Sequence, residues 1–246
     1  MYLSAATTRS WVAQVRDRVT ASGPVEVAVL PSFPLLESTA YALRDTGIHW
    51  GAQDCAASGD GAQTGEVAAS VLAELGCSYV EVGHAERRRL FGEDLATIVA
   101  KSHQVVEAGM TPLYCVGEEH RGSAAEAADE CAAEVEQMVA SVPPLAQGAP
   151  LVLAYEPIWA IGAPCPAPAD YAGVVCASLR ERIRRIAPAT RVLYGGAAGP
   201  GTFAGLAGRA DGLFLGRFAH DPEALGEVVR EVRSAGAGPT AANAVG

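Results

Sequence analysis

Lysine is nearly absent from this chain of 246 residues. Lys101 is the only one, and arginine supplies all other fixed positive side-chain charge. The formal net charge is −10, which argues against non-specific binding to nucleic acid or to an anionic membrane surface. A small anionic substrate is still compatible with this charge, because local hydrogen-bond donors decide whether such a molecule binds.

Paired cysteines of the CxxC type and cysteines at metal-ligand spacing are also absent. The six cysteines are most simply free thiols in a reducing compartment. Residues 1–17 lack the apolar core of a signal peptide, and no apolar run approaches membrane-spanning length. We therefore expect a cytoplasmic protein with no metal centre and no membrane association. The six positions are Cys55, Cys77, Cys115, Cys131, Cys165 and Cys176.

Short apolar runs alternate with longer amphipathic segments along the whole chain, as in βαβ units with a parallel sheet. No composition break divides the pattern, so we expect one α/β domain over residues 1–234 and a flexible Gly/Ala/Pro-rich tail over residues 235–246. Seven strands are predicted against eight helices. This count fits either an open sheet or an eight-stranded barrel that lacks its first strand. The predicted strands are 25–30, 48–52, 79–82, 110–116, 151–155, 191–194 and 212–215, and the helices lie near 7–22, 35–46, 65–75, 93–108, 122–141, 169–186, 201–208 and 221–233.

The stretch from Leu151 to Gly162 places a carboxylate where a buried strand ends. Glu156 follows the apolar run and precedes Pro157, which cannot continue a central strand. Barrels of alternating strands and helices keep their chemistry at this end of the strands. The Trp, small residues and Gly that follow predict a lid. The alternative is an ordinary strand-to-helix connection with a surface Glu.

His84 stands at another strand end, where the chain passes into a turn or helix. A helix N-terminus disfavours imidazolium, so this side chain is expected to be neutral and to donate a hydrogen bond. A structural His bonded to a backbone carbonyl is the alternative. A metal pair of His84 with Glu86 would need a third ligand, which the spacing does not supply.

Two glycine-rich turns follow the last two predicted strands, at Gly195–Gly201 and at Gly216. Exposed backbone N–H groups in such turns bind anions, and in eight-stranded barrels this pair of loops is the common phosphate site. The GxGxxG spacing of dinucleotide-binding folds is absent.

The chain resembles the triosephosphate isomerase family from about residue 25 to about residue 233. The resemblance implies a TIM (β/α)8 barrel whose first strand is missing from this sequence. It also implies an isomerase that uses neither metal nor organic cofactor and takes part in glycolysis and gluconeogenesis. The stretches that carry it are Gly83–Arg88, Ala154–Gly162, Tyr194–Gly196 and Asp211–Gly216, together with Gly51–Cys55 and Gly61–Glu66.

Roles for individual residues follow from this resemblance alone. Glu156 would be the base that moves a proton between adjacent carbons, and His84 the neutral group that polarises the carbonyl. The loop Cys55–Glu66 would reach into a second subunit of a homodimer, although Gln63 stands where the family usually has Phe. The phosphate-binding positions would be Gly162, Ala197, Gly216 and Arg217, and Glu86 would be a supporting carboxylate.

The largest departure from the family lies at the start. The family's first strand ends in an Asn-x-Lys-Met pattern whose lysine contacts substrate, and Met1 falls where that Met should be. Lys101 cannot replace the lysine, since its helix packs outside the barrel. We therefore hypothesise a start codon assigned too late or a truncated chain, and expect a seven-stranded, incompletely closed barrel with little activity. An upstream reading frame without a strand ending in Lys would contradict this.

Further departures touch the substrate site. Ala197 replaces a Ser that binds phosphate, Arg217 replaces a Gly, and Pro164 and Pro166 stiffen the far end of the lid. The expected reaction interconverts dihydroxyacetone phosphate and glyceraldehyde 3-phosphate. These changes suggest a four-carbon substrate as the alternative, an erythrulose phosphate. A barrel that only binds a phosphorylated metabolite is the alternative from another class.

Overall fold

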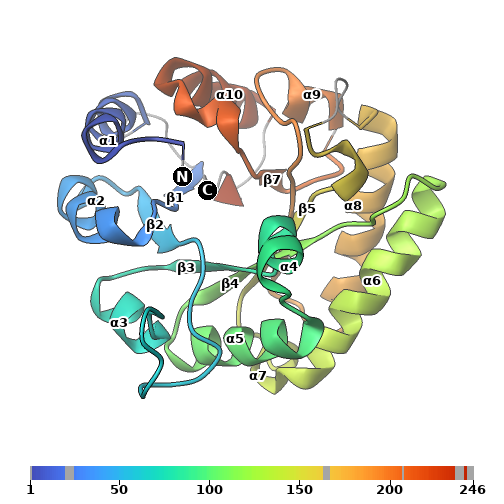
Figure 1. Ribbon diagram of the computed structural model, residues 1–246. Coiled ribbons are helices and arrows are strands. Elements are labelled where there is room, and N and C mark those ends of the chain that lie inside the picture. The colour runs from blue at the N-terminus through green and yellow to red at the C-terminus, as the bar shows by residue number, and fades with distance from the viewer. Residues whose placement is uncertain (1, 20–24, 163–166, 207, 236–240, 243–246) are drawn as a thin grey trace.

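The computed structural model describes residues 2–19, 25–162, 167–206, 208–235 and 241–242. Seven strands fall on the seven predicted runs and curl into the inner wall of a barrel, with helices around the outside (Figure 1). The strands are β1 (Glu26–Val29), β2 (His49–Ala52), β3 (Tyr79–Val82), β4 (Thr111–Val116), β5 (Leu151–Tyr155), β6 (Thr190–Tyr194) and β7 (Gly212–Leu213).

The α-helices alternate with these strands, as the sequence pattern predicts. One addition is α4 (Ala85–Phe91), a short helix directly after His84. It ends at Gly92, whose φ of 70° lies in the left-handed region that favours glycine. The other helices are α1 (Ala5–Val19), α2 (Leu36–Leu43), α3 (Ala69–Glu74), α5 (Leu95–Glu107), α6 (Ala124–Ser141), α7 (Pro143–Ala146), α8 (Ala169–Arg184), α9 (Thr202–Leu206) and α10 (Pro222–Ser234). None of the described helices is long and apolar enough to span a membrane.

All strand pairs are parallel, and the first seven strands lie side by side in chain order. An eighth strand, β8 (Ala241–Ala242), pairs with the outer edge of β1 opposite Glu26 and Val27. A seven-stranded, incompletely closed barrel, as expected from the sequence, would leave this edge of β1 without a backbone partner. That expectation is wrong for the first half of β1, which pairs with β8. Two residues of the predicted tail form β8, because an edge strand leaves hydrogen-bonding groups that another segment can satisfy. Among the described residues no pairing joins β7 to β8, so the hydrogen-bonded barrel is not closed.

A hollow lies beside the second half of β1, next to Val29 and Leu30. Trp11, Leu30, Gln53 and His220 are among the residues that line it. β8 pairs with β1 only at Glu26 and Val27, so the hollow lies farther along β1 than the segment that β8 covers.

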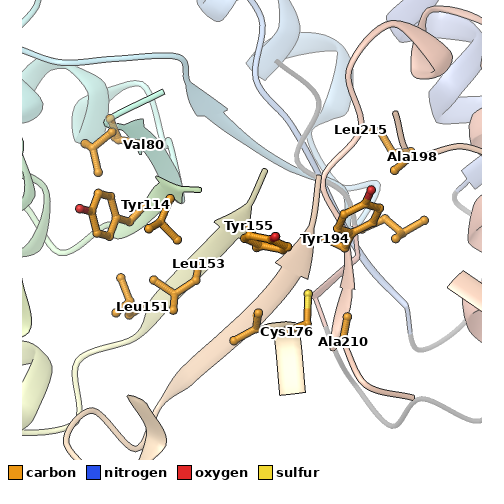
Figure 2. Packing of buried hydrophobic residues seen from close by; sticks show 14 of the residues in the cluster. Val80, Tyr114, Leu151, Leu153, Tyr155, Cys176, Tyr194, Ala198, Ala210 and Leu215 are labelled. Carbon is orange, nitrogen blue, oxygen red and sulfur yellow. The ribbon is translucent and has the colours of Figure 1, made fainter. Parts of the chain in front are cut away.

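Alternation along each strand divides the core in two. Inward-facing side chains fill the barrel, among them Leu113, Val152 and Leu193. Outward-facing ones pack under the helices, and Figure 2 shows part of this outer layer around Tyr155 and Tyr194. Because both faces of the strands are buried, their ends are held firmly and can position functional groups.

A polar cluster lies near the start of the strands, at the end of the barrel opposite to the strand ends that carry Glu156 and His84. We call it the floor cluster: Glu26, Tyr79 and Arg191. The Glu26 carboxylate accepts hydrogen bonds from the Tyr79 hydroxyl and from Arg191 Nη1, the latter at 2.7 Å. Burial acts to raise the pKa of Glu26, but these hydrogen bonds and the Arg191 charge leave it lowered.

Candidate active site

Glu156 comes directly after β5, and both neighbouring strands hold its backbone. Its N–H donates to the Val116 carbonyl at 2.9 Å, and the Gly195 N–H donates to the Tyr155 carbonyl at 2.8 Å. A Cβ on Gly117 would lie 1.8 Å from the Glu156 carbonyl oxygen, and a Cβ on Gly195 would lie 2.4 Å from Glu156 Cγ. Glycine is therefore required on both sides, because any other residue would displace the carboxylate.

The Glu156 side chain is buried, with 9% of the residue's surface exposed, so it is not a surface carboxylate. Burial raises its pKa, while the nearby His84 imidazole and a hydrogen bond from the Gly196 N–H act in the opposite direction. The Gly196 N–H lies 3.2 Å from Oε1. Oε2 is buried and has no hydrogen-bond partner among the described residues. One oxygen is thus fixed and the other is left available to accept a proton.

His84 caps the N-terminus of α4 and faces this carboxylate. Its Nδ1 accepts a hydrogen bond from the Glu86 backbone N–H at 3.2 Å. A nitrogen that accepts carries no proton, so the imidazole is neutral and its proton lies on Nε2. Nε2 is 3.6 Å from Glu156 Oε2. The structure therefore brings the two predicted catalytic residues together across the mouth of the barrel.

Glu86 contributes its backbone to this arrangement, and its side chain is exposed. Within the described part of the chain, no group of three or more His, Cys, Asp or Glu side chains is placed to hold a metal ion.

The predicted phosphate-binding residues lie on exposed loops after β6 and β7. Ala197, Gly216 and Arg217 are all exposed. The two loops touch, since a Cβ on Gly199 would lie 3.1 Å from the Phe218 ring. The Gly196 N–H that bonds Glu156 precedes Ala197 directly, which places this pair of loops beside the carboxylate.

Gly162 lies in the loop after β5, exposed and with a φ of 74°. That positive φ is the left-handed conformation in which glycine is favoured. The predicted stiff end of the lid, with Pro164 and Pro166, lies outside the described residues.

Glu118 is a site residue that sequence reasoning did not single out. It follows β4, is buried, and accepts hydrogen bonds from Trp159 Nε1 at 2.7 Å, the Tyr171 hydroxyl at 2.9 Å and the Tyr155 hydroxyl at 3.1 Å. Trp159 belongs to the short 3-10 helix Ile158–Ala160, directly after Glu156 and Pro157. Glu118 therefore fixes the near end of the predicted lid. The available signal was a carboxylate at a second strand end.

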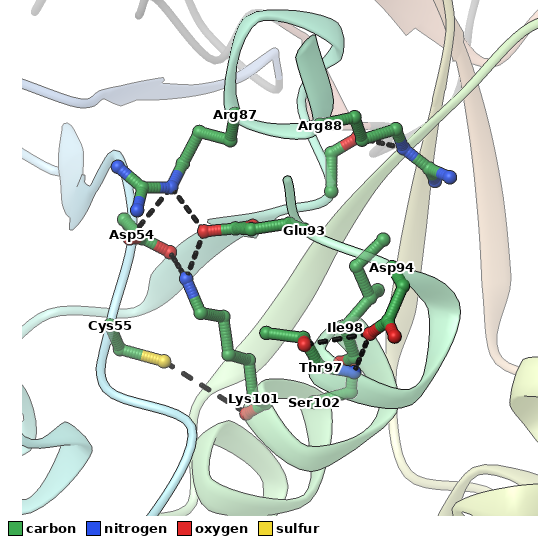
Figure 3. A network of polar contacts seen from close by, with 11 residues as sticks. Asp54, Cys55, Arg87, Arg88, Glu93, Asp94, Thr97, Ile98, Lys101 and Ser102 are labelled. Atoms are coloured by element: carbon green, nitrogen blue, oxygen red, sulfur yellow. Dashed lines mark hydrogen bonds and ion pairs between the residues drawn. The ribbon is translucent and has the colours of Figure 1, made fainter. Parts of the chain in front are cut away.

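The only lysine of the sequence forms ion pairs away from the barrel mouth. Lys101 is 3% exposed on α5, and its Nζ donates to Asp54 Oδ1 at 2.6 Å and to Glu93 Oε1 at 2.5 Å. Arg87 Nε also bonds both carboxylates, so the four side chains form a closed ion cluster (Figure 3). As expected, the Lys101 ammonium is not available at the barrel mouth.

The chain is similar to known proteins over most of its length. The family model described as triosephosphate isomerase matches residues 1–232. The chain is 45% identical over 205 residues to "L-erythrulose-1-phosphate isomerase" of Pectobacterium atrosepticum, covering 82% of this chain and 79% of the relative. It is 38% identical over 213 residues to triosephosphate isomerase of Thermus thermophilus, covering 84% of each chain. It is 34% identical over 230 residues to "Triosephosphate isomerase 2" of Listeria innocua, covering 91% of this chain and 90% of the relative.

Proposed function

This chain belongs to the triosephosphate isomerase family, and from that premise we propose that it isomerises a short phosphorylated ketose through an enediolate. The observation that carries the proposal is the pairing of Glu156 Oε2 with His84 Nε2 at 3.6 Å, at the ends of β5 and β3. The family supports an isomerase. The assignment of roles to these residues is our proposal.

In the proposed reaction Glu156 Oε2 takes a proton from the carbon beside the substrate carbonyl. Burial raises the pKa of this carboxyl, which makes it a stronger base than an exposed one. The accepting atom, Oε2, is buried and has no hydrogen-bond partner among the described residues. The protonated Glu156 then returns the proton to the neighbouring carbon, while the proton of the substrate hydroxyl passes to the former carbonyl oxygen. The carbonyl has then moved by one carbon, and the enzyme is unchanged at the end.

His84 stabilises the negative charge that develops on the substrate oxygen. Its neutral form is fixed because Nδ1 accepts from the Glu86 N–H, so Nε2–H points to the mouth as a donor. A positioned donor of this kind contributes most where charge appears in the transition state.

The phosphate group of the substrate would bind at the loops after β6 and β7. Backbone N–H groups near Ala197 and Gly216 would donate to it, and Gly162 would complete the site from the lid. Arg217, exposed at the start of the 3-10 helix Arg217–His220, would add a guanidinium, which suits bidentate binding of phosphate.

The substrate length has two candidates. The family name points to dihydroxyacetone phosphate and glyceraldehyde 3-phosphate. A four-carbon ketose phosphate is favoured by the 45% identity to the erythrulose-phosphate relative, against 34–38% for the two triosephosphate isomerases. Ala197 and Arg217 at the phosphate loops support the same alternative.

We further propose a homodimer in the cytoplasm. The loop Cys55–Glu66 is largely exposed. On α4 the adjacent side chains Leu90 and Phe91 are 62% and 67% exposed, an apolar patch that a second copy would cover. Among the described residues five cysteines are free and buried, which suits a reducing compartment.

Turnover of dihydroxyacetone phosphate and of L-erythrulose 1-phosphate, measured on the same preparation, tests the proposal and ranks the substrates. Exchange of the substrate's carbon-bound hydrogen with deuterium from the solvent separates an isomerase from a barrel that only binds metabolites. We expect exchange with at least one substrate and its loss in Glu156→Gln. Substrate binding without exchange would support the binding protein instead.

A further inference from the structure

Glu81 is a carboxyl on the inner wall of the barrel. It lies on β3, three residues before His84. Its neighbours Val80 and Val82 belong to the outer core layer, whereas Tyr79 belongs to the inner one. Alternation along the strand therefore points Glu81 into the barrel. Its partner in register on β4 is Leu113, also an inner residue.

The environment of Glu81 disfavours its charged form. The residue is 5% exposed, and its Oε2 is buried without a hydrogen-bond partner among the described residues. The groups that act on it are His84, which favours the carboxylate, and Glu156, Asp54 and Glu86, whose negative charges oppose it.

A thiol on the neighbouring strand completes these surroundings. Cys115 lies on β4, and burial raises the pKa of its thiol with a contribution from the Glu81 charge. Cys115 is therefore a neutral thiol and adds no charge beside Glu81.

Glu156 and Glu81 thus differ in what supports their negative charge. The Gly196 N–H donates to Glu156 Oε1, whereas within the described part of the chain no donor reaches Glu81 Oε2. Burial, with the charge of Glu156 contributing, raises the pKa of Glu81 to about 7. Because Glu156 has this backbone donor and Glu81 Oε2 has none among the described residues, we assign the negative charge to Glu156 and the proton to Glu81.

We propose that Glu81 is a positioning residue for the isomerase: as a neutral acid it leaves Glu156 the ionised base, and as a carboxylate it opposes the anionic substrate and enediolate. This inference rests on the proposed function. A second negative charge in the buried lumen would act strongly, because electrostatic interactions are weakly screened there. Activity should therefore decrease as pH rises through the neutral range.

The test compares kcat/KM between pH 6 and pH 9 in the wild type, in Glu81→Gln and in Glu107→Gln. Glu107 is an exposed carboxylate on α5, so its variant changes the net charge equally without touching the lumen. We expect a decrease of about tenfold or more in the wild type and in Glu107→Gln. In Glu81→Gln the decrease should be below about twofold, because an amide does not ionise.

Inhibition by sulfate gives a readout that does not depend on titration of the substrate phosphate, since sulfate keeps its charge over this range. The inhibition constant should rise with pH in the wild type and stay level in Glu81→Gln. Equal pH dependence in both proteins would overturn the inference and leave the isomerase proposal standing.

Thermal unfolding, which does not require catalysis, separates the proposal on Glu81 from the proposed isomerase function. A pKa of about 7 in the folded state, against the ordinary 4.5, means that the wild type loses stability as pH rises between these values. The Tm of Glu81→Gln relative to the wild type should therefore increase over that window, and Glu81→Leu serves if the amide does not fold. No turnover together with this Tm shift would contradict the isomerase proposal; no Tm shift would contradict the assigned protonation of Glu81.

Discussion

The carboxyls at the two ends of the barrel differ in their hydrogen-bond partners. In the floor cluster, Glu26 has a donor for each oxygen, and its pKa is lowered. At the mouth, Glu156 and Glu81 each have a buried Oε2 without a partner among the described residues, and their pKa values are raised. A carboxyl with partners stabilises the fold, whereas one without them retains the basicity or the proton that chemistry needs.

The largest expected effect is on activity at the mouth. Glu156→Gln removes the proposed base and should lower kcat/KM on the order of 10³-fold. The free energy of unfolding, measured with urea, should change by less than about 1 kcal/mol, because no ion pair is lost and the amide keeps an oxygen for the Gly196 N–H. A large loss of stability with retained activity would mean that Glu156 serves the fold and not the reaction.

The matched change at the floor is Glu26→Gln. It weakens the hydrogen bonds from Tyr79 and Arg191 and should lower the free energy of unfolding by about 1–2 kcal/mol. Isomerase activity should be close to that of the wild type, since Glu26 lies at the other end of the barrel. An activity loss like that of Glu156→Gln would mean that the two ends are not independent.

The pH dependence of stability sharpens this difference. Because the pKa of Glu26 is lowered from 4.5, the folded state binds its proton less tightly than the unfolded state does. Its contribution is present above about pH 4.5 and is lost as the pH falls. The stability difference between the wild type and Glu26→Gln should therefore shrink in acid, and a constant difference would contradict the assigned ion pair.

A smaller effect is expected at the lid. Trp159→Phe removes one of the three aromatic donors to Glu118 but keeps an aromatic ring, and should lower kcat/KM by roughly three- to tenfold. Trp50→Phe is a matched control, because Trp50 Nε1 donates to the Leu75 carbonyl at 3.0 Å between β2 and the turn after α3. Equal effects of the two variants would argue against a role of the Glu118 hydrogen bond in catalysis.

The smallest effect concerns the edge of β1. A chain ending at Ser234 lacks β8 and leaves the backbone of Glu26 and Val27 unpaired, which should cost about 1 kcal/mol. For a chain of this size the Tm should fall by about 2–4 °C. A chain ending at Ala242 keeps β8 and should match the full chain. Equal Tm values for all three would mean that β8 adds no stability.

Sequence patterns predicted the seven barrel strands and the strand ends that carry His84 and Glu156. Strands that are buried on both faces consist of short apolar runs, which can be recognised in the sequence. Parallel strands in a barrel also bring their carboxyl ends to the same end of the barrel. The contacts of Glu118 could not be predicted in this way. Its donors Tyr155, Trp159 and Tyr171 lie 37 to 53 residues along the chain, and only the fold brings them together.

β8 and the environment of Glu81 also escaped prediction, for different reasons. Ala241–Ala242 has no strand-like pattern, and its pairing reflects the open edge of β1. Glu81 is the one charged residue in an otherwise uncharged strand. The alternation of side chains predicts that it points into the barrel, but it does not predict whether a hydrogen-bond donor lies there.

The buried ion cluster around Lys101 provides a way to detect local opening between α5 and the loop that carries Asp54. An amine held by Asp54 and Glu93 and only 3% exposed is shielded from acylating reagents while the cluster is closed. Every event of side-chain acylation at lysine would therefore record one separation of α5 from the loop that carries Asp54. No other side chain of the protein carries an amine. The rate of labelling at Lys101 Nζ, followed by mass spectrometry, would therefore report the rate of this local opening.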